Sequence, residues 1–358
     1  MCDPKAIVGK MRRSVPRLGL LPPTGTRGPA ETSGKLDDSP ARTAATTPTV
    51  TEMIVRLPLL ALLASAALAS TADAATLTFD GSTHRYTAAP GEVNAPSVAR
   101  SPVSYWEQLF SETSAPITVL EGCVSGEPIV CTTGPWIVDL GDRDDRADIV
   151  PFSPNSTVYG GPGNDDFASD GGQAWGYGGS GNDRILLAAD NGTYGWGGRG
   201  RDTLTSGAPG VFLNGEDDDD YLAATGAHSL GTLDGGGGDD TIVAAPTSPV
   251  RASGGLGNDV IITSPDSVGV TGGPGSDRIT SGNNIDAGPG ADRIDVSSGG
   301  SIISCGTGRD TVYVPSASTA VPGDCETVSF GAPAQTASTR DALARFGALR
   351  AEAVRRLR

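Results

Sequence analysis

The sequence has few aromatic residues, few lysines and few histidines. Phenylalanine, tryptophan and tyrosine together make up 5% of its 358 residues, which disfavours an ordinary helical enzyme core. Lysine does not occur after Lys35. Histidine occurs only as His84 and His228, and we expect both to be surface residues rather than catalytic ones.

Positive charge is scarce relative to negative charge. The formal net charge is −16, and residues 75–339 hold eleven arginines against 34 aspartates and glutamates, a balance of 11 − 34 = −23. Binding to nucleic acid depends on Lys and Arg contacts to phosphates, so this balance argues against DNA or RNA as a partner. The acidic balance favours cations as partners instead.

Three common catalytic or metal signatures are missing. The sequence contains no His-Glu-x-x-His, no Gly-x-Ser-x-Gly and no Cys-x-x-Cys. We therefore expect no enzymatic activity. A polysaccharide-active enzyme stays open as an alternative, because two carboxylates held a defined distance apart are enough to cleave a glycosidic bond.

The N-terminal part contains an export signal. Met53 is followed by one arginine, an apolar run over 57–68 and small residues up to Ala74. This pattern is typical of a secretory signal peptide, and the run is shorter than the roughly 20 residues of a membrane span. We assign 53–74 to a signal peptide and treat 1–52 as a disordered leader or a mis-called start. The expected product is a secreted, extracellular protein with no transmembrane segment.

Four of the five cysteines lie in the exported part of the chain, since Cys2 belongs to the leader. An oxidising compartment favours disulfides, and four cysteines permit three pairings. Proximity in the sequence favours Cys123 with Cys131 and Cys305 with Cys325. A metal–thiolate site is the alternative.

A nine-residue phrase, Gly-Gly-x-Gly-x-Asp-x-U-x with U a large apolar residue, recurs from residue 160 onward. Six copies match it strictly and begin at Gly160, Gly178, Gly197, Gly235, Gly254 and Gly272. Three degenerate copies begin at Asn214, Ala287 and Cys305. The eight steps cover 305 − 160 = 145 residues, or about 18 residues each, and such constant phase indicates a repeat architecture.

Two positions of the repeat argue against a disordered linker. The eighth position is large and apolar in every copy: Phe167, Ile185, Leu204, Tyr221, Ile242, Ile261, Ile279, Ile294 and Val312. The sixth position is always aspartate: Asp165, Asp183, Asp202, Asp219, Asp240, Asp259, Asp277, Asp292 and Asp310. A flexible Gly-rich segment has no reason to keep either pattern.

The copies resemble the calcium-binding nonapeptide repeats of RTX (hemolysin-type) proteins, over about residues 140–328. The resemblance implies an all-β fold, a parallel β-roll or β-solenoid with Ca²⁺ bound in its Gly-rich turns. Its ligands would be the sixth-position aspartates and the turn glycines at the second and fourth positions: Gly161, Gly163, Gly179, Gly181, Gly198, Gly200, Gly236, Gly238, Gly255, Gly257, Gly273 and Gly275.

Calcium suits such a site because it accepts six to eight oxygen ligands in flexible geometry. The second half of each coil keeps an apolar or small residue two positions before the first glycine, but it has no aspartate four positions before it. We therefore predict two strands per coil and calcium along a single edge. Up to about eight ions are expected, with folding coupled to their binding.

The same frame predicts side-chain directions. In the fourth copy it places Phe212 inward and Val211 and Leu213 outward. Outward positions of the early copies are aromatic and predict an exposed stripe of Tyr159, Trp175, Tyr177, Tyr194 and Trp196. An exposed stripe would suit a carbohydrate-binding surface protein, which is the second functional alternative. The other possibility is that the N-terminal segment covers the stripe and that the rings only pack.

The two ends of the array differ from its middle. Alternating apolar residues over 75–139 predict a small N-terminal β-cap, and Asp145 lies in an imperfect first repeat of the roll over 140–328. A linker over 329–338 leads to a basic amphipathic helix over 339–358. We expect this helix to be a solvated appendage, or else to bind an anionic cell surface or the acidic flank of the roll.

Overall fold

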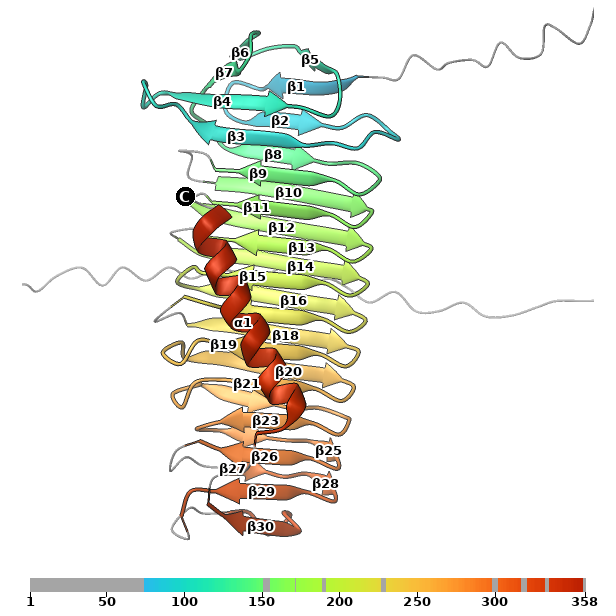
Figure 1. Cartoon of the computed structure of the whole chain (residues 1–358), viewed down its shortest axis with the longest axis vertical. Helices are drawn as coiled ribbons and strands as arrows, with labels where there is room; N and C mark the ends of the chain where they lie inside the picture. The colour runs from blue at the N-terminus through green and yellow to red at the C-terminus, as the bar shows by residue number, and fades with distance from the viewer. Residues whose placement is uncertain are drawn as a thin grey trace, which may run out of the picture. The chain divides into compact units, whose positions relative to one another are not determined.

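The computed structural model describes residues 74–150, 155–170, 172–188, 191–226, 230–297, 302–316, 321–331 and 335–356. Within these ranges two large sheets face each other, and each coil of the chain contributes one strand to each sheet (Figure 1). The predicted parallel β-solenoid with an N-terminal cap and a C-terminal helix is thereby confirmed. The predicted leader, the predicted signal peptide up to residue 73, and His228 lie outside the described residues.

The first sheet contains the longer strand of most coils. Its parallel strands are β8 (Trp136–Asp139), β10 (Asn155–Pro162), β12 (Gln173–Ser180), β14 (Thr193–Arg199), β16 (Val211–Asp217), β18 (Gly231–Gly237), β20 (Val250–Leu256), β22 (Gly269–Thr271), β24 (Ile285–Asp286) and β27 (Ile302–Ser304). Each strand from β10 to β24 pairs with the corresponding strand of the coil before it and of the coil after it.

The second sheet contains the strand that follows each Gly-rich turn. Its parallel strands are β9 (Arg146–Ile149), β11 (Asp166–Ser169), β13 (Arg184–Leu187), β15 (Thr203–Ser206), β17 (Tyr221–Ala224), β19 (Thr241–Ala244), β21 (Val260–Ile262), β23 (Arg278–Ser281), β26 (Arg293–Val296), β29 (Thr311–Val314) and β30 (Thr327–Phe330). A short third ladder pairs β25 (Pro289–Gly290) with β28 (Thr307–Gly308).

The core lies between the sheets and is built by alternation along each strand. Inward residues of the second sheet, such as Phe167 and Ile185, are buried to 0% and 1% exposure. The facing positions of the first sheet are small where these neighbours are large. A Cβ added to Gly176 would lie 2.9 Å from Cγ2 of Ile185 and 3.0 Å from Cε2 of Phe167. Large and small residues therefore fill one space from opposite sheets.

The fourth coil shows that the predicted frame was wrong by one residue there. Leu222 occupies the inward column that was predicted for Tyr221, because β17 pairs Leu222 with Leu204 and with Ile242. In the first sheet Val211 and Leu213 are buried inward, and Phe212 lies outward between them. The predicted directions of these three residues are thus reversed.

The N-terminal cap covers the first coil with seven strands. They are β1 (Ala75–Phe79), β2 (His84–Thr87), β3 (Pro96–Arg100), β4 (Glu107–Glu112), β5 (Ile117–Val119), β6 (Cys123–Val124) and β7 (Ile129–Thr132), several of them antiparallel. Trp136 stacks on Phe110 with ring centroids 5.5 Å apart and donates its indole N–H to Gln108. The cap thereby closes the open end of the core, as solenoid ends require.

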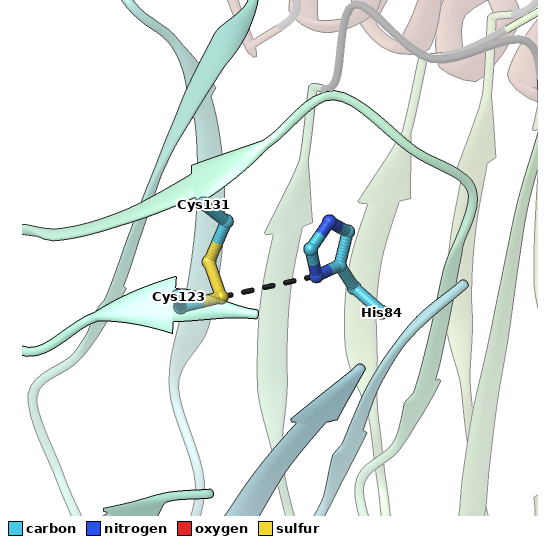
Figure 2. Close-up of side chains that lie close together, drawn as sticks. All are labelled: His84, Cys123 and Cys131. Carbon is cyan, nitrogen blue, oxygen red and sulfur yellow. Dashed lines mark hydrogen bonds between the residues drawn. A yellow bond between two sulfur atoms is a disulfide. The ribbon is translucent and has the colours of Figure 1, made fainter. Parts of the chain in front are cut away.

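His84 is fully buried in this cap, so the expectation of a surface histidine was wrong. Figure 2 shows its ring beside the Cys123–Cys131 disulfide, with Nδ1 3.8 Å from Sγ of Cys123. Its ring stacks between Phe79 and Trp136, and Nε2 lies 2.8 Å from the carbonyl oxygen of Thr132. Burial lowers its pKa below the usual value for histidine. The stacked ring is part of the cap's core.

Both predicted disulfides are confirmed. Cys123 and Cys131 join neighbouring strands of the cap, and Cys305 and Cys325 join the last coil to the segment that closes it. Because all four cysteines are paired, the alternative of a metal–thiolate site is set aside.

The C-terminal helix α1 (Ala337–Arg356) lies along the outer face of the second sheet (Figure 1). Its buried residues Ala342, Phe346 and Leu349 pack on outward apolar residues of β17, β19 and β21, and the Tyr221 hydroxyl donates to the carbonyl of Ala342 at 2.8 Å. No helix among the described residues is long and apolar enough to cross a membrane.

Ionic contacts hold the last turns of α1 to the early coils. Arg356 is 8% exposed and binds the carboxylates of Asp148 and Asp166, and Glu352 pairs with Arg184. Of the three possibilities considered for this basic helix, the structure shows binding to the acidic flank of the solenoid. The contacts of the helix run from Arg278 in β23 to Asp148 in β9, so it connects these coils.

Candidate functional site: a buried column of aspartates

The Gly-rich turns stack on one another along the edge that joins the first sheet to the second. Each glycine predicted at the second and fourth positions has a positive φ, from 102° at Gly161 to 151° at Gly163 in the first strict copy. A Cβ at any of them would lie less than 3.0 Å from the backbone of the preceding turn. Both the backbone conformation and the close stacking therefore favour glycine, although Glu216 and Asp218 adopt φ values of 78° and 79° at the same two positions of the fourth copy.

One aspartate of each turn points into the solenoid, and together these residues form a column. The aspartate column comprises Asp145, Asp165, Asp183, Asp202, Asp220, Asp240, Asp259, Asp277, Asp292 and Asp310, and each member is at most 3% exposed. The Oδ1 atom of each member after Asp145 accepts the backbone N–H of the preceding member at 2.7–2.9 Å. Consecutive members are 15 to 20 residues apart in the chain.

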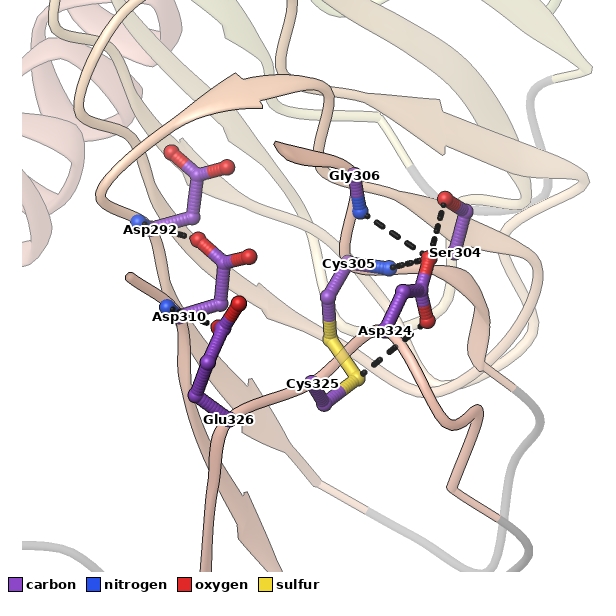
Figure 3. The surroundings of a disulfide bond; sticks show 8 residues. All are labelled: Asp292, Ser304, Cys305, Gly306, Asp310, Asp324, Cys325 and Glu326. Carbon is purple, nitrogen blue, oxygen red and sulfur yellow. Dashed lines mark hydrogen bonds between the residues drawn. A yellow bond between two sulfur atoms is a disulfide. The ribbon is translucent and has the colours of Figure 1, made fainter. Parts of the chain in front are cut away.

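Two groups outside the column complete this ladder of hydrogen bonds. At its start, the N–H of Asn94 in the cap donates to Oδ1 of Asp145 at 2.5 Å. At its end, the N–H of Asp310 donates to Oε2 of Glu326 at 2.7 Å (Figure 3). The ladder thus runs from the cap to the closing segment, and Asp145 belongs to it although Arg143 replaces a turn glycine.

The fourth copy of the repeat contributes Asp220 to the column, and not Asp219 as the predicted frame had it. Four consecutive aspartates, 217–220, made the frame ambiguous, and the predicted frame began this copy at Asn214. The structure begins it at Gly215, because a Cβ there would collide with Oδ2 of Asp220 and the carbonyl oxygen of Gly235. The other six first-position glycines make the same two close contacts, and this shared geometry identifies Gly215 as the start of the copy.

The second oxygen of every column carboxylate is buried without a hydrogen-bond partner among the described residues. This holds for the Oδ2 atoms of all ten members. The same close packing recurs at the first-position glycine of seven copies, where an added Cβ would lie less than 3.0 Å from Oδ2 of the aspartate and from a carbonyl oxygen of the next coil: Gly160, Gly178, Gly197, Gly215, Gly235, Gly254 and Gly272. One carboxylate oxygen and one carbonyl oxygen, from two coils, thus converge on each of these glycines.

The carbonyl oxygen that approaches this glycine beside Oδ2 is the first-position carbonyl, which the resemblance did not predict. At Gly160, for example, it belongs to Gly178. The resemblance predicted the carbonyls of the second and fourth positions as ligands. These carbonyls pack against glycines of the following coil. The carbonyl oxygen of Gly161, for example, packs against Gly179. The structure therefore brings the predicted aspartates together with a different set of glycine oxygens.

Burial raises the pKa of the column carboxyls, and the hydrogen bond to Oδ1 opposes this shift. For most members, neighbouring carboxylates raise the pKa further. The resulting pKa is about 6 for Asp165, Asp259 and Asp292, about 7 for Asp145, Asp183, Asp202, Asp240 and Asp277, and about 8 for Asp220. A bound proton or cation would therefore stabilise each of these Oδ2 atoms, which have no hydrogen-bond partner among the described residues.

The column changes at its C-terminal end, where the first position is Ala287 and then Cys305. Both residues carry a Cβ at the place that glycine leaves open beside the earlier aspartates. The last coil is instead closed by Asp324, whose carboxylate accepts hydrogen bonds from the Ser304 hydroxyl and from the N–H groups of Cys305 and Gly306 (Figure 3). These hydrogen bonds lower the pKa of Asp324.

A second ladder, which the sequence analysis missed, runs along the solvent side of the same turns. It uses the fifth position of the repeat, and its side-chain oxygens accept the backbone N–H of the next coil. Its acceptors are Asp144, Asn164, Asn182, Asp219, Asp239 and Asn258. Asp219 belongs to this exposed outer ladder. The recurrent Asn or Asp at the fifth position was the available signal.

The aromatic stripe is present, but its rings cover one another. Tyr177 stacks on Tyr159 at 5.0 Å and on Trp196 at 4.6 Å between ring centroids, and Trp175 stacks on Tyr194 at 5.7 Å. The stacked pairs are inclined by only 3° to 11°. Neighbouring ring faces are therefore occupied, and the exposed part of the stripe consists mainly of ring edges.

Comparison with protein-family models, with curated proteins and with solved structures finds no match to this sequence.

Proposed function

We propose that this protein is an exported calcium-binding β-solenoid, with Ca²⁺ bound along the aspartate column. The observation that carries the proposal is the set of ten buried Oδ2 atoms without a partner among the described residues. Leaving a carboxylate oxygen buried and unpaired is costly, so a cation that binds there would stabilise the fold.

The hydrogen-bond ladder alone does not explain why every member of the column is aspartate. An asparagine would accept the same backbone N–H through Oδ1, and its NH₂ group could donate to the nearby carbonyl. The outer ladder does use asparagine at Asn164, Asn182 and Asn258. The exclusive use of aspartate in the inner column therefore favours a role for the negative charge.

The donor set consists of carboxylate and carbonyl oxygens, which are hard ligands suited to calcium. Magnesium is less suitable because it demands a near-ideal octahedron and gives up its water reluctantly. Both donors converge on the first-position glycine in seven copies, and we assign one ion to each pair of donors. When bound, the ions would supply the positive charge that the column lacks.

Other features agree with this proposal without carrying it. The repeats resemble those of RTX calcium-binding proteins, and the apolar run over 57–68 resembles a secretory signal. Two disulfides suit an oxidising compartment outside the cytoplasm. The proposed function is binding, without catalysis.

Calcium titration of the chelator-treated protein tests the proposal by calorimetry. We expect about seven ions to bind the wild type, and the Asp259→Asn variant to lose affinity at one or two neighbouring sites. The matched control is Asp239→Asn, which removes the same charge from the outer ladder of the same region and should bind as the wild type does. Absence of calcium binding, or equal binding by Asp259→Asn, would refute the proposal.

A further inference from the structure

The outward face of the first sheet carries a groove beyond the end of the stacked rings. The groove has a volume of about 430 Å³, within the range of small-ligand sites, and is open to solvent. Its floor follows one column of side chains across four neighbouring strands, in which Tyr194 pairs with Phe212, Phe212 with Thr232, and Thr232 with Arg251. Strands lie about 4.8 Å apart, so this floor is roughly 14 Å long.

Ring stacking ends within this groove. The Tyr194 and Phe212 rings are 6.4 Å apart and tilted by 34°, in contrast to the parallel pairs before them. The next floor residue is Thr232, so no aromatic ring follows Phe212 in this column. The sides of the groove include Leu230 and Val268, which are 69% and 44% exposed. The groove therefore offers apolar surface that the ring stripe does not.

The charge of the groove is the reverse of the charge of the protein. Arg251 is exposed, and it is the only charged residue among the described residues that line the groove. It forms no ion pair with a described residue. Asp234 lies on the same sheet face, but in the neighbouring column of side chains. A guanidinium that forms no ion pair with a described residue of an acidic protein favours a carboxylate ligand, which it can bind through two parallel hydrogen bonds.

We propose that this groove binds an acidic saccharide chain, with a sugar ring over Phe212 and a uronic-acid carboxylate at Arg251. A pyranose has an apolar C–H face and a polar rim, which suit the ring and the Thr232 hydroxyl. A peptide cannot add here as a strand, because β14 to β20 are paired on both sides. The groove shares no residue with the aspartate column, so this proposal does not depend on the calcium proposal.

The test measures binding of a short oligogalacturonate to the full exported chain at one fixed free calcium concentration. We expect Arg251→Gln to weaken binding by about tenfold, the loss of one charge-assisted contact. Arg309→Gln, the same change at an exposed arginine outside the groove, should bind as the wild type does. Phe212→Leu should weaken the binding of acidic and neutral oligosaccharides alike.

Two further ligands separate the sources of affinity. A neutral oligosaccharide of equal length should bind more weakly than oligogalacturonate, and polyglutamate, which has carboxylates without sugar rings, should not compete. The proposal is overturned if wild type does not bind oligogalacturonate, if Arg251→Gln binds it equally well, or if polyglutamate competes with equal affinity. Circular dichroism of each variant confirms that the fold is kept.

Discussion

The inner aspartate column and the outer ladder lie one residue apart in the same turns, yet they have different chemistry. Both use a side-chain oxygen to accept a backbone N–H from a neighbouring coil. The outer ladder is exposed and accepts Asn as readily as Asp, whereas the inner column is buried and contains only Asp. Hydrogen bonding explains the first pattern. The second requires an additional reason to bury charge, and we attribute it to cations.

The largest expected effect comes from adding a methyl group to a first-position glycine, next to a column carboxylate. Gly254→Ala would place a Cβ against Oδ2 of Asp259 and the carbonyl oxygen of Gly272, so we expect a loss of about 3 kcal/mol in the free energy of unfolding. Gly269→Ala, where no atom lies within 4 Å of the added Cβ, should change it by less than about 0.5 kcal/mol. Urea unfolding measures the free energy of unfolding of both variants. Equal losses would show that the packing around Gly254 adjusts to the added methyl group without cost.

The calcium-free protein should lose stability as the pH rises. The column carboxyls have raised pKa values of about 6 to 8, so the folded state binds more protons than the unfolded state, whose aspartates titrate near 3.9. Stability is then greatest below about pH 4 for these groups and declines through pH 8, by several kcal/mol in sum.

Thermal unfolding across this pH range, in calcium-free buffer, measures the effect. The unfolding temperature should fall less steeply with pH for Asp259→Asn than for Asp239→Asn, because only the first variant removes a buried carboxyl. If the two variants have the same slope, general charge repulsion rather than the column causes the pH dependence.

Without calcium, an asparagine in the column should stabilise the fold more than an aspartate does. At pH 8 we expect Asp259→Asn to stabilise the calcium-free protein by about 1 kcal/mol, since the amide keeps the Oδ1 hydrogen bond and adds a donor. Saturating calcium should reverse the order, so that wild type unfolds at the higher temperature. A variant that is less stable under both conditions would contradict this prediction.

The smallest effect is expected at the outer ladder. Asn258→Asp keeps the acceptor for the Ser276 N–H but loses the 3.0 Å amide hydrogen bond to Asp239 and places two carboxylates side by side. In an exposed position this should cost about 0.5 kcal/mol, and calcium affinity should not change. A large loss in either quantity would mean that the two ladders are not independent.

The sequence predicts the repeat better than it predicts what packs around it. Glycine at positive φ and a buried apolar residue leave local signals, so the solenoid, the turns and both disulfides could be predicted. The frame failed at 217–220 because four aspartates offer several registers, and only the contact between Gly215 and Asp220 selects one. The docking of α1 depends on outward residues of three separate coils, such as Tyr221 and Val243, which no local pattern marks.

The most direct test of the central claim is the number of protons released when calcium binds at pH 7, measured by calorimetry in buffers of different ionisation enthalpy. Carboxyls with pKa values of about 6 to 8 hold part of their protons at this pH, and a bound cation must displace them. We predict proton release from wild type and Asp239→Asn, and less from Asp259→Asn. Calcium binding without proton release, or no calcium binding, would contradict the account.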